Sequence, residues 1–321
     1  MTNPGVARRF ERAVVTGGAG FVGAHLCELL LAQRLEVIAV DNLATSSADT
    51  LDGLRRHERF RFLRHDVTHP MPLPGRADVV FHLASAASPR DYLALPLETL
   101  RAGSHGTENA LELARRDDAR FVLASTSEVY GDPLEHPQRE EYWGNVNPIG
   151  PRSVYDEAKR YAEALTSAYR REHGVDTGIA RIFNTYGPGM RAHDGRMIPA
   201  FVGQALKGEP ITVTGTGEQT RSICYVEDTA RGLLELARSG HPGPVNIGNP
   251  HELTVRQVAE WIRDITGSGS PIEEIDAVAD DPKRRCPDIS LARDVLGWEP
   301  KVDADDGLRR TVAWFRRAPL R

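Results

Sequence analysis

Tyr155 and Lys159 are the two residues whose types and spacing most directly suggest catalysis. They lie four residues apart in the segment Tyr-Asp-Glu-Ala-Lys, so on a helix their side chains share one face. A phenol with a reference pKa of about 10 is a poor base at neutral pH, and a nearby ammonium group favours its ionised form. Because the chain holds only four lysines, we interpret the pair as a candidate general base with its partner, against the alternative of a solvated helix.

A second polar group follows an apolar segment that ends at Ala124. It reads Ser-Thr-Ser-Glu-Val-Tyr-Gly over residues 125–131. If the apolar segment is a strand of an open α/β sheet, this is the edge at which ligands bind. Thr126 is then a candidate to hydrogen-bond a reacting hydroxyl, and Glu128 is a candidate to move a proton or position water. A polar cap on the strand end is the alternative interpretation.

Three glycines predict a dinucleotide phosphate site. Gly17, Gly20 and Gly23 follow a short apolar run and open a helical pattern that begins with Phe21 and Val22. In this context the glycines permit a tight turn, a close approach of phosphate to the backbone and close packing of helix on strand. Backbone amides at the helix N-terminus can then receive a pyrophosphate.

Acidic residues after the next strands indicate which cofactor binds there. Asp41 lies 18 residues after Gly23, where a carboxylate can accept hydrogen bonds from the adenosine ribose and repel a 2′-phosphate. The sequence therefore predicts NAD rather than NADP. Asp66 is a candidate for the adenine, with a loop-capping role as the alternative. The predicted cofactor site is completed by residues at the ends of the neighbouring strands and at the start of the helix: Phe21, Val22, Asn42, Val67, Leu83, Ser85 and Ala124.

The elements that must position these residues alternate between short apolar runs and helical patterns, which is typical of βαβ units. Predicted strands in the first half span residues 13–16, 36–40, 59–63, 79–83, 121–124 and 177–182. Shorter strands, at 211–213 and 245–247, and an amphipathic helix at 225–238 follow. We expect an α/β fold with a Rossmann-type doubly wound parallel sheet over residues 1–183, and a smaller α/β substrate domain over 184–321. Residues 222–248 are expected to pack back on the first domain.

Composition restricts the partners. A net charge of −5 over 321 residues disfavours nucleic acid, and no run of 18 apolar residues predicts a membrane span. Cys27, Cys224 and Cys286 are few, odd in number and far apart, which fits neither a disulfide framework nor a clustered metal site. We expect a cytoplasmic protein without a structural metal.

Together the motifs resemble the UDP-glucuronate decarboxylase (UDP-xylose synthase) family of the extended short-chain dehydrogenase/reductases. The resemblance extends from about Ala13 to Phe315. It rests on TGGAGFVG, VDN, STSEVYG, YDEAK and RIFNTYGP, and on GDP at 131–133, YWG at 142–144, NPIGPR at 147–152, DGR at 194–196, QTR at 219–221, NIGNP at 246–250, DP at 281–282, PDI at 287–289 and LGWEP at 296–300.

This resemblance implies a reaction in which C4 of a glucuronosyl ring is oxidised at the expense of bound NAD. The ring carboxylate is then β to a ketone and leaves as carbon dioxide, and reprotonation at C5 followed by return of the hydride gives UDP-xylose. Tyr155 would be the base, Lys159 its electrostatic partner and a ribose ligand, and Thr126 a partner of the C4 oxygen. Ser127 and Glu128 match positions that face the carboxylate end of the sugar.

The resemblance also implies residues for the rest of the substrate. Arg285 matches the arginine expected at the sugar carboxylate, with a surface charge run as the alternative. Asn184, Arg191 and Arg221 match or neighbour positions around the UDP, where planar forked donors suit phosphate oxygens. The family further implies a homodimer built by the Tyr155 helix and its neighbour.

Three departures from the family pattern bear on the cofactor and UDP. Relatives usually carry Lys-Thr-Asn where this chain has Arg101-Ala102-Gly103. Ser46 replaces a glycine after the second strand, and Gly189 stands where an arginine is common. Membrane-anchored members carry an N-terminal extension that this sequence does not include.

Other functions share most of these motifs. A sugar-nucleotide 4,6-dehydratase normally has an aspartate at the position of Ser127, where it protonates the leaving hydroxyl. A 4-epimerase usually lacks the glutamate found at position 128. A non-catalytic NAD-binding regulator commonly loses the tyrosine–lysine pair that this chain retains.

Overall fold

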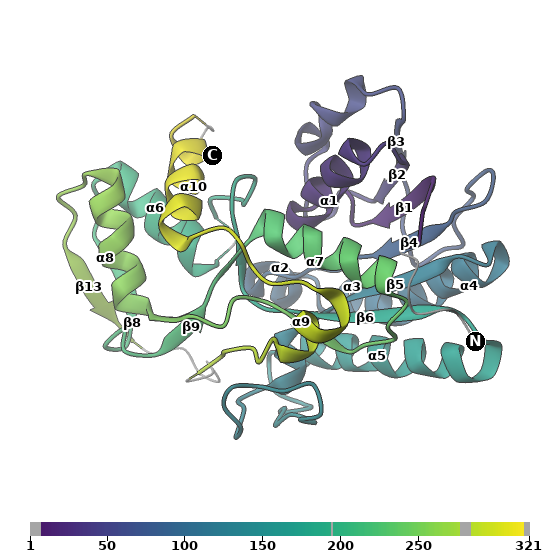
Figure 1. Ribbon diagram of the computed structural model, residues 1–321. Coiled ribbons are helices and arrows are strands. Elements are labelled where there is room, and N and C mark those ends of the chain that lie inside the picture. Colours follow the sequence, from purple (N-terminus) through teal and green to yellow (C-terminus); the bar gives the residue numbers. More distant parts are fainter. Residues whose placement is uncertain (1–7, 194, 277–283, 318–321) are drawn as a thin grey trace.

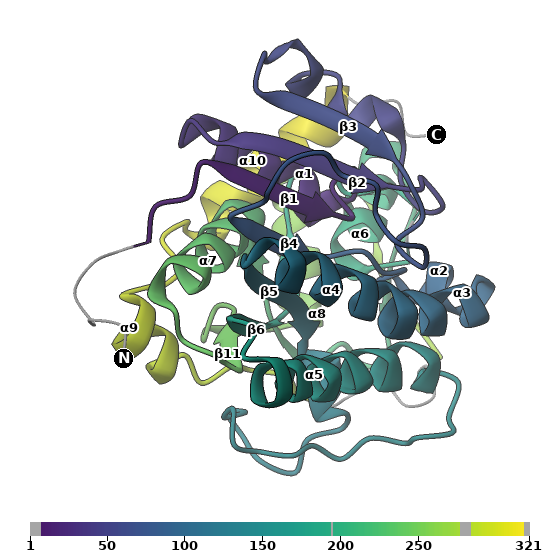
Figure 2. The same cartoon turned by 90° about the vertical axis from the view of Figure 1, so that its right-hand side faces the viewer.

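A computed structural model describes residues 8–193, 195–276 and 284–317. At its centre lies a sheet of seven strands in the order β11-β6-β5-β4-β1-β2-β3, and every neighbouring pair is parallel. Figure 2 shows the strands in this order, from β3 at the top to β11 at the bottom. The strands are β1 (Arg12–Thr16), β2 (Glu36–Asp41), β3 (Phe60–Arg64), β4 (Val79–His82), β5 (Arg120–Thr126), β6 (Thr177–Ile182) and β11 (Val245–Ile247).

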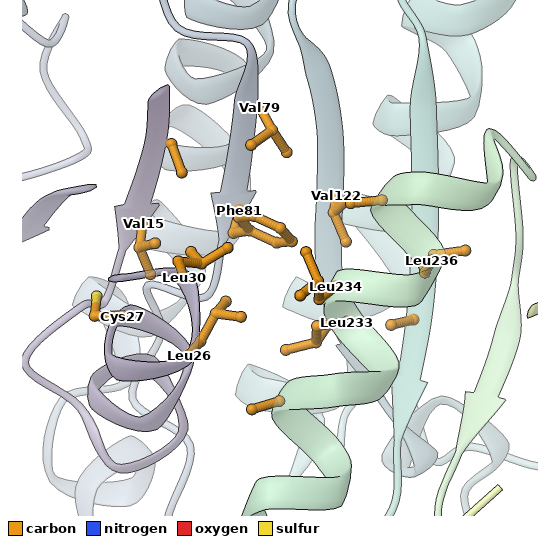
Figure 3. Packing of buried hydrophobic residues seen from close by; sticks show 14 of the residues in the cluster. Val15, Leu26, Cys27, Leu30, Val79, Phe81, Val122, Leu233, Leu234 and Leu236 are labelled. Carbon is orange, nitrogen blue, oxygen red and sulfur yellow. The ribbon is translucent and has the colours of Figure 1, made fainter. Parts of the chain in front are cut away.

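Alternate residues of a strand point to opposite faces of the sheet, and here the residues on both faces are apolar. Helices therefore cover both faces. Ala13 and Val15 pack under α1 (Phe21–Ala32) and α7 (Val226–Ser239), whereas Val14 packs on the other face. Figure 3 shows α1 and α7 side by side, with Leu26 and Leu233 meeting above the strands. The helices α4 (Thr107–Asp117) and α5 (Ser153–His173) cover the second face (Figure 2).

A second core lies beside the sheet, on the left in Figure 1. It joins α6 (Met197–Lys207), α8 (Val255–Thr266) and α10 (Ala304–Arg317) to three two-stranded sheets. These sheets pair β7 (Thr185–Tyr186) with β10 (Cys224–Tyr225), β9 (Thr220–Ser222) with β12 (Glu252–Thr254), and β8 (Ile211–Thr214) with β13 (Ile272–Ile275).

The chain returns twice from the second part to the first. β11 pairs with β6 at the edge of the central sheet, directly after α7. Later α9 (Ser290–Leu296) and Trp298 join the core beneath α7, where Trp298 Nε1 donates to Asp228 O at 3.1 Å. The core of the sheet therefore includes chain beyond residue 248 as well as the expected 222–248 segment.

Several short elements connect these strands and helices. They are α2 (Pro89–Ala94), α3 (Pro96–Arg101), a π-helix at Ala102–Gly106 and 3-10 helices at Ala48–Leu51, Leu54–Arg56 and Ser127–Tyr130. Strand order reverses between β1 and β4, so the crevice at their carboxyl ends is where a doubly wound sheet binds its ligand. Among the described residues, no helix has the length and apolarity needed to cross a membrane.

The predicted strands lie within about two residues of the observed ones. The largest difference concerns β5, which continues through Ser125 and Thr126 instead of ending at Ala124. Both extra residues are buried and pair with β6. The polar segment therefore begins inside the sheet, and Thr126 is held by strand pairing rather than by a loop.

Candidate active site

The glycine turn joins β1 to α1 in the crevice. Gly17 has φ +70°, and a Cβ there would lie 2.8 Å from the backbone of Leu83 and Ala84. A Cβ on Gly23 would lie 2.1 Å from Gly17 O, so helix and turn touch backbone to backbone. Among the described residues, no side chain caps the N-terminus of α1, and its first turn holds no acidic residue. The amides of residues 17–20 already donate to Val40 O, Asp41 and Gly17 O. The donors that suit a pyrophosphate are therefore those of the first turn of α1, at the positive end of the helix.

Asp41 ends β2 beside this turn and is nine-tenths buried. Its carboxylate accepts hydrogen bonds from Ala19 N at 3.1 Å, Leu43 N at 2.8 Å and Ser46 Oγ at 3.0 Å. Ser46, which departs from the family glycine, therefore helps to hold Asp41. The carboxylate is fixed where the sequence places the ribose site.

Asp66 caps the loop after β3 and also contacts the predicted adenosine segment. Its Oδ1 accepts from Thr68 N and Thr68 Oγ1, and its Oδ2 accepts from Asn42 Nδ2 at 3.1 Å. Burial opposes ionisation, but these hydrogen bonds lower the pKa of Asp66 below its usual value. Val67 is buried beside it, and Val67 O accepts from Asn109. The loop-capping interpretation thus describes the contacts of Asp66, and the adenine role stays a prediction.

The other predicted cofactor residues line the ends of β4 and α1. Leu83 N donates to Thr16 O at 3.1 Å, and Ser85 follows in a half-buried bend. Phe21 and Val22 form the half-buried first turn of α1. All of them lie at the strand-order reversal.

A buried histidine that the sequence analysis did not identify supports this edge. His82 Nδ1 lies 2.8 Å from Thr16 Oγ1, and His82 Nε2 lies 3.2 Å from Thr107 Oγ1. Burial, with the positive charge of Lys159 nearby, lowers the pKa of His82 to about 3. His82 is therefore a neutral hydrogen-bonding link between β1, β4 and α4, a role that no local sequence signal indicates.

Tyr155 and Lys159 lie on the buried face of α5 against the end of β5. Lys159 Nζ donates to Ala124 O at 2.9 Å and lies 5.9 Å from the centroid of the Tyr155 ring. Desolvation lowers the pKa of Lys159 to about 8, although Glu163 opposes the shift. Lys159 is thus mostly protonated at neutral pH.

The Tyr155 phenol is unionised in this environment. Burial and the Glu128 carboxylate raise the pKa of Tyr155 above its usual value, while a hydrogen bond with Thr126 acts in the opposite direction. The Tyr92 ring of α2 stacks on it with a centroid distance of 5.3 Å. The expected lowering of the tyrosine pKa by the lysine is not seen, and the Lys159 ammonium donates to Ala124 O.

Glu128 belongs to the 3-10 helix after β5, and its carboxylate lies between the side chains of two arginines. Arg285 binds it with both terminal nitrogens, Nη1 to Oε1 at 2.5 Å and Nη2 to Oε2 at 3.0 Å. Arg152 Nη2 donates to Oε2 at 2.8 Å. Burial opposes ionisation, but Arg285 and Arg152 lower the pKa of Glu128 to about 2. Ser127, which is 2% exposed, precedes it in the same turn.

Arg285 is held by backbone contacts on both sides. Ser222 N of β9 donates to Arg285 O at 3.3 Å, and Cys286 N donates to the buried Gln138 Oε1 at 2.8 Å. The side chain is 95% buried. Arg285 is therefore an internal arginine whose backbone is anchored on both sides, which excludes the alternative of a solvated charge run.

Two residues near Glu128 and Arg285 were not identified as site residues from the sequence. Arg152 immediately precedes α5, and only its place in the NPIGPR motif pointed to it. Asp156 lies one residue after Tyr155, is 6% exposed, and its buried Oδ1 has no hydrogen-bond donor among the described residues. Desolvation and the Glu128 charge raise the pKa of Asp156 to about 7.

The predicted UDP residues lie on the second part of the chain. Asn184 O accepts from Cys224 N, and Arg221 lies on β9 next to the segment of Arg285. Arg191 forms an ion pair with Asp91 of α2. A cleft of about 1090 Å³ runs between the two parts and is lined by Phe21, His25, Arg90, Asp91, Arg191 and Trp314 among others. Its lining includes neither Tyr155 nor Glu128, so the cleft does not contain these two predicted catalytic residues.

The departures at positions 103 and 189 have local structural reasons. Gly103 lies in the π-helix against α5, where a Cβ would come 2.7 Å from Ala158 Cβ. Any side chain at position 103 would therefore displace the helix that carries Lys159. Gly189 has φ +89° on the cleft wall, a conformation that favours glycine over arginine.

One group of potential metal ligands exists among the described residues. Ligand atoms of His136, Glu252 and Cys286 lie within 4.8 Å of one another. Arg284 Nη2 lies 2.9 Å from His136 Nε2 and 3.5 Å from Glu252 Oε2. Because a guanidinium already pairs with two of the three groups, this cluster does not favour a cation. Three residues of the sequence motifs, Asp194, Asp281 and Pro282, lie outside the described residues.

Comparisons with known proteins identify the family. Residues 13–248 match the NAD dependent epimerase/dehydratase family. A UDP-glucuronic acid decarboxylase of Arabidopsis thaliana is 51% identical over 95% of this chain and 89% of its own length. One of Xenopus tropicalis is 49% identical over 96% of this chain and 72% of its own length.

Solved structures of related enzymes have the same fold. A UDP-glucuronic acid 4-epimerase from Bacillus cereus, in complex with UDP-glucuronic acid and NAD, aligns with a TM-score of 0.83 at 26% identity and covers 95% of this chain and 99% of its own. A dTDP-glucose 4,6-dehydratase from Streptomyces venezuelae with NAD bound gives 0.86 at 30% identity, covering 95% and 97%.

Proposed function

The chain belongs to the NAD dependent epimerase/dehydratase family, and we propose that it decarboxylates UDP-glucuronate to UDP-xylose with NAD as a retained cofactor. The observation that carries this proposal is the bidentate contact of Arg285 with a carboxylate. That carboxylate belongs to Glu128, close enough to Tyr155 to raise the pKa of the phenol. A sugar carboxylate that replaced it on Arg285 would lie near Tyr155, the residue proposed to take the proton of the C4 hydroxyl.

The residues at the crevice fit NAD. The turn at Gly17 and Gly23 leaves no room for side chains, the N-terminus of α1 offers free donors, and Asp41 is fixed where a ribose would lie. Lys159 is the candidate to reach the nicotinamide ribose. When bound, NAD supplies a reversible acceptor for the C4 hydride.

Tyr155 is proposed to take the proton of the C4 hydroxyl, with Thr126 as a hydrogen-bonding partner of the same oxygen. A buried, unionised phenol is a poor base, so a positive charge is needed to favour its ionised form. Lys159 supplies this charge, since its pKa of about 8 keeps it mostly protonated at neutral pH. The ammonium donates to Ala124 O, and the proposal requires it to turn towards the phenol and the ribose during the reaction.

Arg285 and Glu128 are proposed to act on the 4-keto acid. Arg285 orients the carboxylate, the C5–C6 bond breaks, and its electron pair passes into the enolate of the 4-ketone as carbon dioxide leaves. A proton then adds to C5, and Glu128, with Ser127 beside it, is the candidate to guide that proton through water. Arg152 keeps Glu128 in place when Arg285 turns to the substrate, because it binds Glu128 independently.

An assay with UDP-glucuronate tests the proposal. Purified protein is expected to release carbon dioxide and UDP-xylose in equal amounts without net formation of NADH. Accumulation of UDP-4-keto-pentose with NADH would indicate an oxidative variant. Absence of carbon dioxide would contradict the decarboxylase assignment, and elimination of water from a neutral UDP-hexose would favour the dehydratase alternative.

We also propose that the sugar nucleotide binds to residues 184–321, opposite an NAD-binding part formed by residues 1–183 with 222–248. Arg221 supports this division. It lies in the second part, next to the segment that carries Arg285, which is the arginine proposed to bind the sugar carboxylate. Arg221→Ala is expected to weaken UDP binding and leave NAD binding unchanged; an equal loss of both would contradict the division.

A homodimer is proposed through α2, α3 and α5. Leu93, Leu97, Leu100 and Tyr161 expose large apolar side chains on these helices, which is typical of a protein interface. Leu97→Glu is expected to shift the mass measured by light scattering from dimer to monomer. Leu134→Glu, which adds the same charge at an exposed apolar residue of the 131–152 loop, should leave the mass unchanged.

A reducing compartment such as the cytoplasm is proposed as the location. Cys27, Cys224 and Cys286 are free and buried, so folding needs no oxidant. Fractionation of cells that express the chain tests this, and recovery in a membrane or secreted fraction would contradict it.

A further inference from the structure

The buried Asp156 has no part in the mechanism above, although it belongs to the same cluster of charges. This arginine–carboxyl cluster consists of Glu128, Arg152, Arg285 and Asp156. Glu128 takes hydrogen bonds from both arginines, whereas the buried Oδ1 of Asp156 takes none from any described residue. The two carboxyl groups therefore differ sharply in how their charge is compensated.

A carboxylate buried without a donor is costly, so the group tends to take up a proton instead. The position of Asp156 in the first turn of α5 favours its ionised form through the helix dipole, and the charges of Arg152 and Arg285 act in the same direction. Burial, Glu128 and Glu157 act against it and prevail, which raises the pKa to about 7. Tyr92 and Tyr155 complete the surroundings as unionised phenols.

The net charge of the cluster depends on this proton. With Asp156 neutral, two guanidinium groups face one carboxylate and one positive charge remains. With Asp156 ionised, the cluster is already neutral, and an incoming carboxylate would make it negative. The binding affinity of a neutral sugar would not depend on this charge, whereas the affinity of an acidic sugar would.

We propose that Asp156 is a positioning residue that determines specificity for an acidic sugar: it joins this cluster as a neutral carboxylic acid and so leaves one arginine charge for the substrate carboxylate. The inference rests on the proposed function and adds to it a residue that does not itself contact the substrate. It predicts that affinity for UDP-glucuronate falls as Asp156 loses its proton.

Calorimetric titration of NAD-loaded protein tests the proposal, in a Tyr155→Phe background that stops turnover. We expect the Kd for UDP-glucuronate to rise on the order of tenfold between about pH 6 and 8.5, since one added negative charge within several ångströms is worth at least that much. Asp156→Asn keeps the shape but fixes the charge at zero. It should remove most of the rise and leave only the part due to the loss of the Lys159 proton towards pH 8.5. It should also bind UDP-glucuronate more tightly than the parent at pH 8.5, a gain that misfolding cannot produce.

UDP-glucose, which lacks the carboxylate, is the control and should show the same weak pH dependence in both proteins. A second measurement needs no variant at position 156. Near pH 7.5, binding of UDP-glucuronate should take up a fraction of a proton, seen as a dependence of the binding heat on buffer ionisation enthalpy, and UDP-glucose should take up none.

An equal pH dependence with and without Asp156→Asn would overturn the proposal, as would weaker binding by Asp156→Asn at pH 8.5 or an absence of proton uptake. Release of carbon dioxide by the protein with Tyr155 intact separates the two claims. If it occurs while the pH dependence is unchanged, only the role of Asp156 fails. If it does not occur, the proposed function fails.

Discussion

Removal of Arg152 should loosen Glu128 by an amount that the structure allows us to work out. Two arginines lower the pKa of Glu128 from 4.5 to about 2, and each pKa unit corresponds to about 1.4 kcal/mol, which gives on the order of 3 kcal/mol in favour of the folded state. Arg285 makes two of the three hydrogen bonds and Arg152 makes one. We therefore expect an Arg152–Glu128 coupling of about 1 kcal/mol.

The assay is a double-mutant cycle in urea at pH 7 with Arg152→Ala, Glu128→Gln and the double variant. The coupling should fall as the pH drops from about 4.5 towards 2, because a carboxyl group with a lowered pKa stabilises the folded state only where it is ionised. Arg310 and Glu227, which are half exposed and 3.5 Å apart, form the control pair and should couple by less than about 0.5 kcal/mol. A coupling for Arg152 no larger than the control would refute the reasoning.

Four further predictions concern the cofactor and the reaction. Tyr155→Phe should abolish C4 oxidation while UDP binding, measured by calorimetry, is retained; residual turnover would exclude Tyr155 as the base. Arg285→Ala should lower the rate of carbon dioxide release more than the affinity for UDP, and equal losses would count against its contact with the carboxylate. Gly23→Ala should reduce NAD affinity at least about tenfold, because its Cβ would lie 2.1 Å from a carbonyl oxygen. Gly53→Ala, whose Cβ would have nothing within 4 Å, should leave NAD affinity unchanged. Equal effects of the two substitutions would contradict a role of the glycine turn in binding NAD. Activity should fall above about pH 8 as Lys159 loses its proton, and a rate unchanged up to pH 10 would argue against its electrostatic role.

Much of the fold could be predicted because its signals are local. The glycine turn, the apolar strand segments and the acidic residue at the end of β2 follow each other in fixed register, and parallel strands place their carboxyl ends at one edge. Tyr155 and Lys159 share a helix, so spacing alone predicted their proximity. Arg285 and Glu128, by contrast, are 157 positions apart, and only the family resemblance suggested that they act together.

The properties of the site that could not be predicted from the sequence depend on which groups the fold buries and on what surrounds them. The raised pKa of Tyr155 follows from its buried position and from Glu128, and neither is visible in a Y-x-x-x-K spacing. In the sequence Asp156 is an ordinary acidic residue at the start of a helix. Only the structure shows that it is buried and that its Oδ1 has no donor among the described residues. From the sequence, Gly103 is a position where this chain lacks the side chain that its relatives carry. The structure shows that Gly103 lies so close to Ala158 that no side chain fits there.

The central claim is that oxidation at C4 is reversed within one turnover, which makes the chain a lyase rather than a dehydrogenase. UDP-glucuronate labelled with deuterium at C4 tests this most directly, with the product analysed by mass spectrometry and NMR. The account predicts UDP-xylose that retains deuterium at C4, one carbon dioxide per product and no net NADH. Loss of the label with accumulation of a 4-keto product, or no release of carbon dioxide, would contradict it.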